Sequence, residues 1–395
     1  MRNHDYLLPG ILVLVMACST AMAQPTFDSR SGGSDGALDF TGQSGVIDFE
    51  PFTFNPPLDP DGDQVFHFTT ITIPADVTIR MRADKLPNGP VYWLATGDVI
   101  IEGTLDLRGE QGSPQGPRGA ALPGPGGFPG GVGQGTNSAA TRGGGPGGGD
   151  ASTNSGVASA SHATGGREYG NVFLTPLIGG SGGGGYNGGS SIVGGGAGGG
   201  AILIASNTVI RVAGTVSVRA GGSGFNGGQI SGHGSGGAIR LLAPSIEGSG
   251  SLLASSSSVA GRIRMESFSN THSGNIEGSF RIVRLVESVR FLPEDRPPLV
   301  RVTSIGGVAV PNNPTGNIFS PDVTIDSAVP VVVAVAAEKI PLGTELTLQI
   351  WSDTAGLQTV QTTPLAGTLE ASTASAMVTF APEASRIFVR AQWTP

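Results

Sequence analysis

Three glutamates stand directly before a glycine in similar sequence contexts and are the first candidates for chemistry. They are Glu102, Glu247 and Glu277, each preceded by isoleucine. If they stack in a column, they could hold calcium or supply the carboxylate pair of a glycosidase. Carboxylates in a column repel one another unless cations lie between them. The alternative is that each is a solvated turn residue.

Three arginines form a second candidate set. Arg80, Arg108 and Arg219 each end a short apolar, alternating segment. Stacked guanidinium groups could bind an acidic sugar or a lipopolysaccharide phosphate. The alternative is a series of exposed ion pairs with neighbours such as Asp76 and Asp106, which are individually weak.

A metal site is indicated only at Asp59, Asp61 and Asp63, which surround a proline and a glycine. Clustered carboxylates in a flexible loop are the ligands that calcium prefers. The spacing is not that of an EF-hand, because glycine follows the third position of the cluster. The alternative is an ordinary Asp-Gly turn. Calcium is the one cofactor that the sequence brings into consideration.

No residue is assigned a catalytic role. The histidines are widely spaced, so no zinc site is expected. In the segment Gly232–Gly236 (GHGSG) the serine is one place away from the nucleophile-elbow pattern, and the segment lies in a glycine-rich loop.

Five octets predict the elements that would position these side chains. They share the form apolar-x-small-Thr/Ser-apolar-x-apolar-x, in which every second residue would be buried in a strand. Octet starts are separated by 28, 111, 34 and 30 residues, so one interval carries an insertion. We expect each octet to lie on the next, as in a β-solenoid. The octets are 73–80, 101–108, 212–219, 246–253 and 276–283.

The insertion spans residues 109–200 and holds runs such as GGGPGGG at 143–149. It contains too much glycine for a side-chain core and is too long for an ordinary loop. Two alternatives remain: a mobile segment or a stacked polyproline-II layer. A collagen triple helix is excluded because the triplet register fails.

The chain divides into five parts by composition. Residues 1–23 are expected to be a signal peptide, 24–64 an irregular leader, 65–290 a glycine-rich β-repeat domain, 291–299 a linker, and 300–395 a β-sandwich domain. The expected fold class is all-β: a glycine-rich β-solenoid or β-helix-like repeat domain followed by a small antiparallel β-sandwich.

Composition excludes some classes of function. The formal net charge is -8, and lysine occurs only at Lys85 and Lys339. A nucleic-acid partner would need a concentrated basic face, so none is expected. The 66 glycines and 13% charged residues disfavour a conventional helical or α/β enzyme.

The N-terminus predicts export. An apolar stretch precedes Ala21–Ala23, a small-x-small cleavage site. Cys18 lies in a sequence similar to a lipoprotein box, so lipidation there is the alternative, and a membrane partner is expected only in that case. The localisation is therefore extracellular or at the cell surface.

Three phrases carry a resemblance to a known group: residues 94–107, 236–244 and 261–265. They are similar to secreted glycine-rich repeat proteins of environmental bacteria that carry an immunoglobulin-like β-sandwich behind the repeats. The resemblance implies export and a repeat architecture, and it assigns no catalytic residue.

Without a convergent acid-base set, the sequence predicts an exported, non-catalytic surface or extracellular-matrix protein. We expect it to be adhesive or to contact carbohydrate, with extracellular polysaccharide or cell-surface components as partners. The alternative is a polysaccharide lyase or glycosidase on a β-helix scaffold, with Glu102, Glu247 or Glu277 paired to Arg108 or Arg219. A third hypothesis makes 300–395 a secretion or docking module.

Overall fold

The structure is a computed structural model that describes residues 27–59, 62–86, 89–113, 120–133, 140–151, 169–188, 191–226, 229–255, 260–285, 298–311, 314, 321–327, 329–352, 355–383 and 385–391. The predicted signal peptide and Cys18 lie outside these ranges. Within them the regular elements are strands, apart from one 3-10 turn, η1 (Pro51–Thr53), so the all-β prediction is confirmed. None of the described residues belongs to a helix long and apolar enough to cross a membrane.

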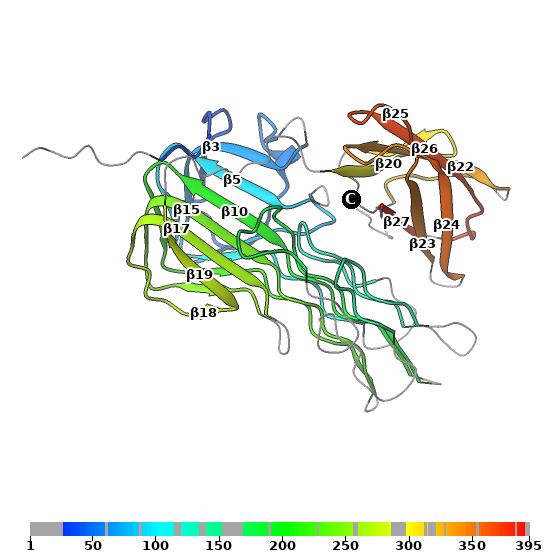
Figure 1. The fold of residues 1–395 in the computed structure, drawn as a ribbon, viewed down its shortest axis with the longest axis horizontal. Coiled ribbons are helices and arrows are strands. Elements are labelled where there is room, and N and C mark those ends of the chain that lie inside the picture. The colour runs from blue at the N-terminus through cyan, green and yellow to red at the C-terminus, as the bar shows by residue number, and fades with distance from the viewer. Residues whose placement is uncertain are drawn as a thin grey trace, which may run out of the picture.

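The larger parallel sheet contains nine strands. In spatial order they are β10 (Ala201–Ser206), β5 (Val91–Ala95), β3 (Val65–Ile73), β6 (Val99–Ile101), β11 (Val209–Val212), β15 (Ala238–Glu247), β17 (Arg262–Asn270) and β19 (Ser279–Arg284), with β1 (Gly36–Asp39) on β3. Figure 1 labels six of them: β3, β5, β10, β15, β17 and β19.

Six of these strands form a closed circuit of parallel pairings. The order β10, β5, β3, β6, β11, β15 returns to its start because β15 also pairs with β10. The expected fold class, a glycine-rich β-solenoid or β-helix-like repeat domain plus a small antiparallel β-sandwich, is therefore wrong: the strands form a closed six-stranded parallel β-barrel with parallel sheets. The physical reason is that β3 and β15 are long enough to pair with two shorter strands each, which joins segments expected to be separate.

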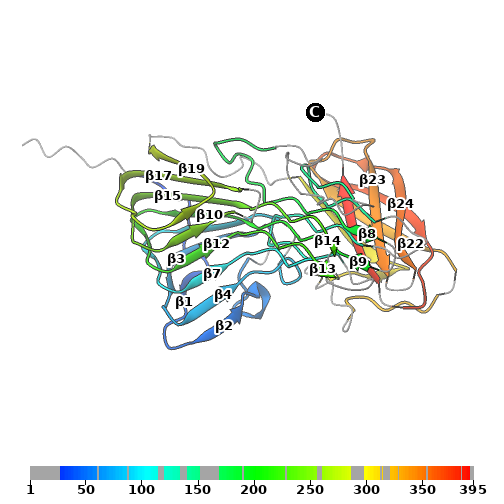
Figure 2. The ribbon, with the colours of Figure 1, turned by 90° about the horizontal axis from the view of Figure 1, so that it is seen from below.

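A second parallel sheet of six strands, hereafter sheet B, contains the later half of the first four octets and only the start of the fifth, whose later half lies in β19 of the larger sheet. Its order is β18 (Ile276–Glu277), β16 (Ser251–Leu253), β12 (Thr215–Ser217), β7 (Thr104–Asp106), β4 (Val77–Arg80) and β2 (Gly45–Asp48). β1 and β2 belong to the segment expected to be an irregular leader. Figure 2 shows β2, β4, β7 and β12 in succession on one side of the molecule.

Alternation along the strands builds one core between the parallel sheets. In β4 and β7 the buried residues Ile79 and Leu105 are paired across the strands and point inward. An aromatic cluster closes the first part of this core: the Trp93 ring lies 5.6 Å from Phe49 and 5.9 Å from Phe68. Tilted aromatic contacts of this kind add to the free energy of burial.

Glycine is required at the bend between the two sheets because backbones there approach closely. A Cβ on Gly214 would overlap the carbonyl oxygen of Gly103, and one on Gly250 would overlap that of Gly214. A Cβ on Gly274 would overlap the oxygen of Gly250 in turn. These three turns therefore share one requirement: each must leave space for the backbone of the preceding turn.

The described glycine-rich segments of the insertion are packed against one another. Gly182, Gly183 and Gly198 have no room for a side chain, because each would place a Cβ onto a backbone carbonyl of another segment. None of the three has a positive φ, so the restriction is steric. Of the two alternatives for the insertion, its described residues take the stacked one.

Hydrogen bonds between these segments recur every third residue. The amide of Gly180 donates to the Gly199 carbonyl, and the amide of Gly183 donates to Gly196. Polyproline II has three residues per turn, so such a step is what stacked polyproline-II segments produce. The same three-residue spacing recurs between two further pairs of segments. The amides of Gly195 and Gly198 donate to the carbonyls of Gly131 and Phe128, and those of Gly196 and Gly199 donate to Gly232 and Ser235.

We expect Gly198→Ala to destabilise the protein by about 3 kcal/mol or more, because the methyl group would overlap the Gly180 carbonyl. Gly222→Ala is the matched control: the nearest atom to its Cβ would be Gln111 Cγ at 3.8 Å. The control should be neutral or stabilising by about 0.5 kcal/mol through the unfolded state. Urea unfolding measures both, and equal effects would contradict a close-packed glycine bundle.

A buried ionic cluster fastens part of the insertion to the large sheet. Glu266 Oε1 lies 2.8 Å from Arg240 Nε and 2.9 Å from Arg264 Nε, and all three side chains are buried. Arg264 donates to the Val172 carbonyl, and Arg240 to Thr175 Oγ1. The cluster therefore holds this segment on the outer face of β15 and β17.

Replacing Glu266 with glutamine leaves two buried guanidinium groups without a counter-charge. We expect a loss of about 3–5 kcal/mol in the free energy of unfolding. Glu247→Gln is the control, because Glu247 pairs with the half-exposed Arg211 and should cost less than about 1 kcal/mol. If chemical denaturation finds the two variants equally stable, the ionic cluster does not have this role.

The C-terminal residues form two antiparallel sheets around their own core, drawn in yellow to red in Figure 1. Val333, Val335, Leu346 and Leu348 are fully buried between them. One sheet contains β21 (Val308–Ala309), β20 (Leu299–Ile305), β22 (Val331–Glu338), β26 (Ser372–Val378) and β25 (Ala366–Gly367); the other contains β24 (Gly356–Pro364), β23 (Glu345–Ser352) and β27 (Ser385–Ala391). Two short antiparallel pairs, β8 (Tyr186–Gly188) with β9 (Ser191–Val193) and β13 (Phe225–Asn226) with β14 (Gln229–Ile230), complete the described strands.

Candidate functional site

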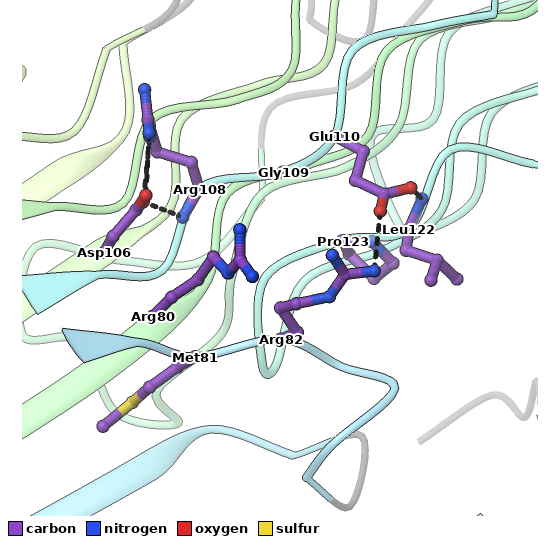
Figure 3. A pocket seen from close by; sticks show the side chains of 9 residues that line it. All are labelled: Arg80, Met81, Arg82, Asp106, Arg108, Gly109, Glu110, Leu122 and Pro123. Atoms are coloured by element: carbon purple, nitrogen blue, oxygen red, sulfur yellow. Dashed lines mark hydrogen bonds and ion pairs between the residues drawn. The ribbon is translucent and has the colours of Figure 1, made fainter. Parts of the chain in front are cut away.

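A pocket of about 180 Å³ opens where sheet B meets the glycine-rich insertion. β4 ends at Arg80 and β7 at Asp106, and beyond them the chain turns toward the insertion (Figure 3). Because the two strands are parallel neighbours, their ends deliver side chains to the same edge of the sheet. The lining residues are Arg80, Met81, Arg82, Asp106, Arg108, Gly109, Glu110, Leu122 and Pro123.

Arg80 is held by a carboxylate from the N-terminal strand β2. Its Nε and Nη2 donate to Asp48 Oδ1 and Oδ2 at 2.6 and 3.0 Å. The hydrogen bond from Arg80 lowers the pKa of Asp48, and burial opposes that shift. The Asp48 carboxylate is therefore ionised at neutral pH and fixes the guanidinium plane.

Arg108 makes the same kind of bidentate pair within its own strand end. Its Nε and Nη2 lie 2.8 and 2.7 Å from the two oxygens of Asp106. Asp106 Oδ1 also accepts the backbone N–H of Arg108. The side-chain hydrogen bonds to Asp106 and the attraction of its charge raise the pKa of Arg108. The predicted pairing of Arg108 with Asp106 is confirmed.

Arg82 and Glu110 connect the sheet to the insertion. Arg82 donates to both oxygens of Asp84 and, at 3.1 Å, to Glu110 Oε1. The other Glu110 oxygen accepts the backbone N–H of Leu122 at 3.0 Å. Figure 3 shows Glu110 reaching to both partners from above the pocket. The wall of the pocket is thereby fixed by hydrogen bonds on both sides.

The arrangement favours binding over acid-base chemistry. In the pocket each carboxylate already accepts hydrogen bonds from a guanidinium group, and Asp106 and Glu110 from a backbone N–H as well. Guanidinium groups in such pairs retain further N–H donors, and carboxylates retain lone pairs. A ligand rich in hydroxyl groups can use both kinds of site at once.

The structure does not bring the three predicted glutamates into one column. Glu102 is exposed in the turn between β6 and β7, and Glu247 ends β15, where it pairs with Arg211. Glu277 lies in β18 of sheet B, opposite Leu253. The reason is turn length: the equivalent turns contain different numbers of residues, so positions that match in sequence do not match in space.

Turn length also separates Arg80 from the other two predicted arginines. Arg80 pairs in register with Asp106. Beside Arg108, the amide of Gly109 donates to the carbonyl of Arg219. Only Arg80 and Arg108 line the pocket. Arg219 instead forms an ion pair with Glu277, and this hydrogen bond, with those from Ser255 and Asn275, lowers the pKa of Glu277.

The predicted calcium loop is described in part, since Asp61 lies outside the described residues. Asp59 is buried, and its two oxygens accept the backbone N–H groups of Asp63 and Gln64 at 3.0 and 2.8 Å. The described residues contain no group of three or more potential metal-ligating side chains. Calcium binding here stays a prediction.

Burial raises the pKa of Asp59 from 3.8 to about 7, and the nearby Asp63 charge adds to this shift. The unfolded chain releases this proton at lower pH, so ionisation of Asp59 destabilises the fold progressively between about pH 4 and pH 7. Asp59→Asn cannot ionise and keeps one acceptor oxygen. We expect the stability of the variant relative to the native chain to increase from pH 4 to pH 8 in urea titrations. A difference that does not change with pH would contradict this origin.

Sequence reasoning missed Asp48, Arg82 and Glu110. Asp48 comes from a segment expected to be irregular, and no periodicity marks it as a partner of Arg80. Arg82 and Glu110 each lie two residues beyond an octet, 73–80 and 101–108, so their position after a strand is a signal that the sequence does offer. The pocket depends on residues that follow the strands as well as on those within them.

Comparison of the chain with protein-family models, with curated proteins and with solved structures found no match.

Proposed function

We propose that this chain is an exported, non-catalytic surface or extracellular-matrix protein that contacts carbohydrate. The observation that carries the proposal is the pocket at the end of β4 and β7, where guanidinium groups and carboxylates are fixed in pairs. Paired charges of this kind present donors and acceptors to hydroxyl groups without a surplus of positive charge. Export is proposed from the N-terminal sequence.

The rigidity of the pocket supports the proposal. Its side chains are attached to parallel strands and to the glycine bundle, and each charged group is held by at least one hydrogen bond. A binding site that is already ordered loses little conformational entropy when a ligand binds. Weak individual contacts to sugar hydroxyls can then contribute to a net affinity.

The enzymatic alternative, a lyase or glycosidase, has one observation in its favour: Glu277 and Arg219 are in contact. Glu277 is not part of the pocket, and its lowered pKa keeps it ionised. An ionised carboxylate can act as a base or nucleophile but cannot donate a proton as a general acid. The pair therefore lacks the acid half of a hydrolase mechanism.

The test incubates purified residues 24–395 with insoluble polysaccharides and measures protein retained on the solid and sugar released together. We expect retention without release. Arg82→Gln should weaken retention about 10-fold or more, because a charged donor is lost from the pocket. Arg211→Gln, which alters an exposed ion pair outside the pocket, is the control and should retain wild-type affinity.

Sugar release would contradict a non-catalytic role and direct mutagenesis to Glu277. Retention by no polysaccharide of the panel would contradict carbohydrate contact. Circular dichroism and thermal melting of each variant separate lost binding from lost folding.

A further inference from the structure

Four hydroxyl side chains form a straight row across the outer face of sheet B. Thr78 of β4 pairs in register with Thr104 of β7, Thr104 with Thr215 of β12, and Thr215 with Ser251 of β16. We call these four residues the hydroxyl row. In each strand the next residue is fully buried, so alternation turns the hydroxyl row outward.

The hydroxyl groups of the row are free to bind a ligand. All four residues are partly exposed, and within the described part of the chain their side chains form no hydrogen bond. A hydroxyl group both donates and accepts. The three threonines are β-branched and restricted at χ1, so their hydroxyl groups are ordered before a ligand arrives.

The row has a regular spacing and leads to the pocket. Neighbouring strands lie about 4.8 Å apart, so the hydroxyl groups repeat at that interval across the sheet. This interval is close to the length of one sugar ring in an extended chain. Thr78 and Arg80 lie on the same face of β4, two residues apart, as do Thr104 and Asp106 on β7. The hydroxyl row and the pocket thus form one continuous polar surface.

We propose that this surface binds one extended, uncharged polysaccharide chain that runs across the strands, with successive rings over successive threonines and one end in the pocket. The inference rests on the proposed function and adds to it the class of ligand and its orientation. The hydroxyl row is uncharged, and Arg80, Arg82 and Arg108 in the pocket are each paired with carboxylates. A polyanion would require surplus positive charge, so the surface matches a neutral chain.

Threonine is also common in strands simply because it favours them. That explanation predicts no effect on binding when the hydroxyl groups are removed and the β-branched shape is kept. The Thr104→Val/Thr215→Val double variant makes this change in the middle of the row. Thr72→Val is the matched control, because Thr72 is a partly exposed threonine in a parallel strand, β3, of the large sheet.

The measurement is binding of the full mature chain to insoluble neutral polysaccharides, of the β-1,4-linked glucan and chitin type, with a soluble acidic polysaccharide as competitor. We expect the double valine variant to bind about 10-fold more weakly and Thr72→Val to bind as the native chain does. Thr104→Ser/Thr215→Ser restores both hydroxyl groups and should recover most of the affinity. The acidic competitor should not displace the chain.

The outcomes separate the two proposals. Wild-type retention that survives both valine substitutions would refute the hydroxyl row while leaving carbohydrate contact in place. Displacement by the acidic competitor would refute the neutral ligand. Retention on none of the polysaccharides would refute both proposals. Thermal melting identifies a variant that fails to fold, and in that case the Thr104→Val and Thr215→Val single variants decide.

Discussion

Close approach of backbone to backbone is the constraint on which the rest of this structure depends. At the bend between the parallel sheets, Gly103, Gly214 and Gly250 follow one another with no space for a Cβ. The stacked segments of the insertion show the same restriction at Gly182 and Gly198. Hydrogen bonds between these backbones replace the apolar side chains of an ordinary core. Burial of a paired amide and carbonyl avoids the cost that an unpaired group would carry.

Because of this constraint, the side chains that can contact a ligand come mainly from the strands. A segment packed through glycine has few side chains to offer a ligand, whereas sheet B has an outward residue at every second position. The described contacts place Asp48, Arg80, Asp106 and the threonines on that outward face. The glycine segments contribute a rigid wall, which reaches the pocket through the backbone of Leu122.

Part of the fold could be predicted from the sequence. Alternation correctly identified Ile79, Leu105 and Val216 as buried residues of neighbouring parallel strands. Which polar side chains become neighbours across the strands could not be predicted in the same way. The turn before Thr78 is longer than the turn before Thr104. Alignment of the octets therefore matches Thr104 with Asp76, whereas in the structure Thr104 pairs with Thr78. A slip of two residues keeps each side chain on its face but assigns it the wrong neighbours.

The same slip explains why Arg80 does not lie beside Arg108, which it matches in sequence. Arg80 lies in register between Asp48 and Asp106, so a row expected to hold like charges alternates in sign. Alternation removes the repulsion that a column of arginines or glutamates would carry. It also removes the surplus charge on which recognition of a polyanion depends. The arrangement of charges on this surface therefore depends on turn lengths, because turn lengths decide which charged residues become neighbours across the strands.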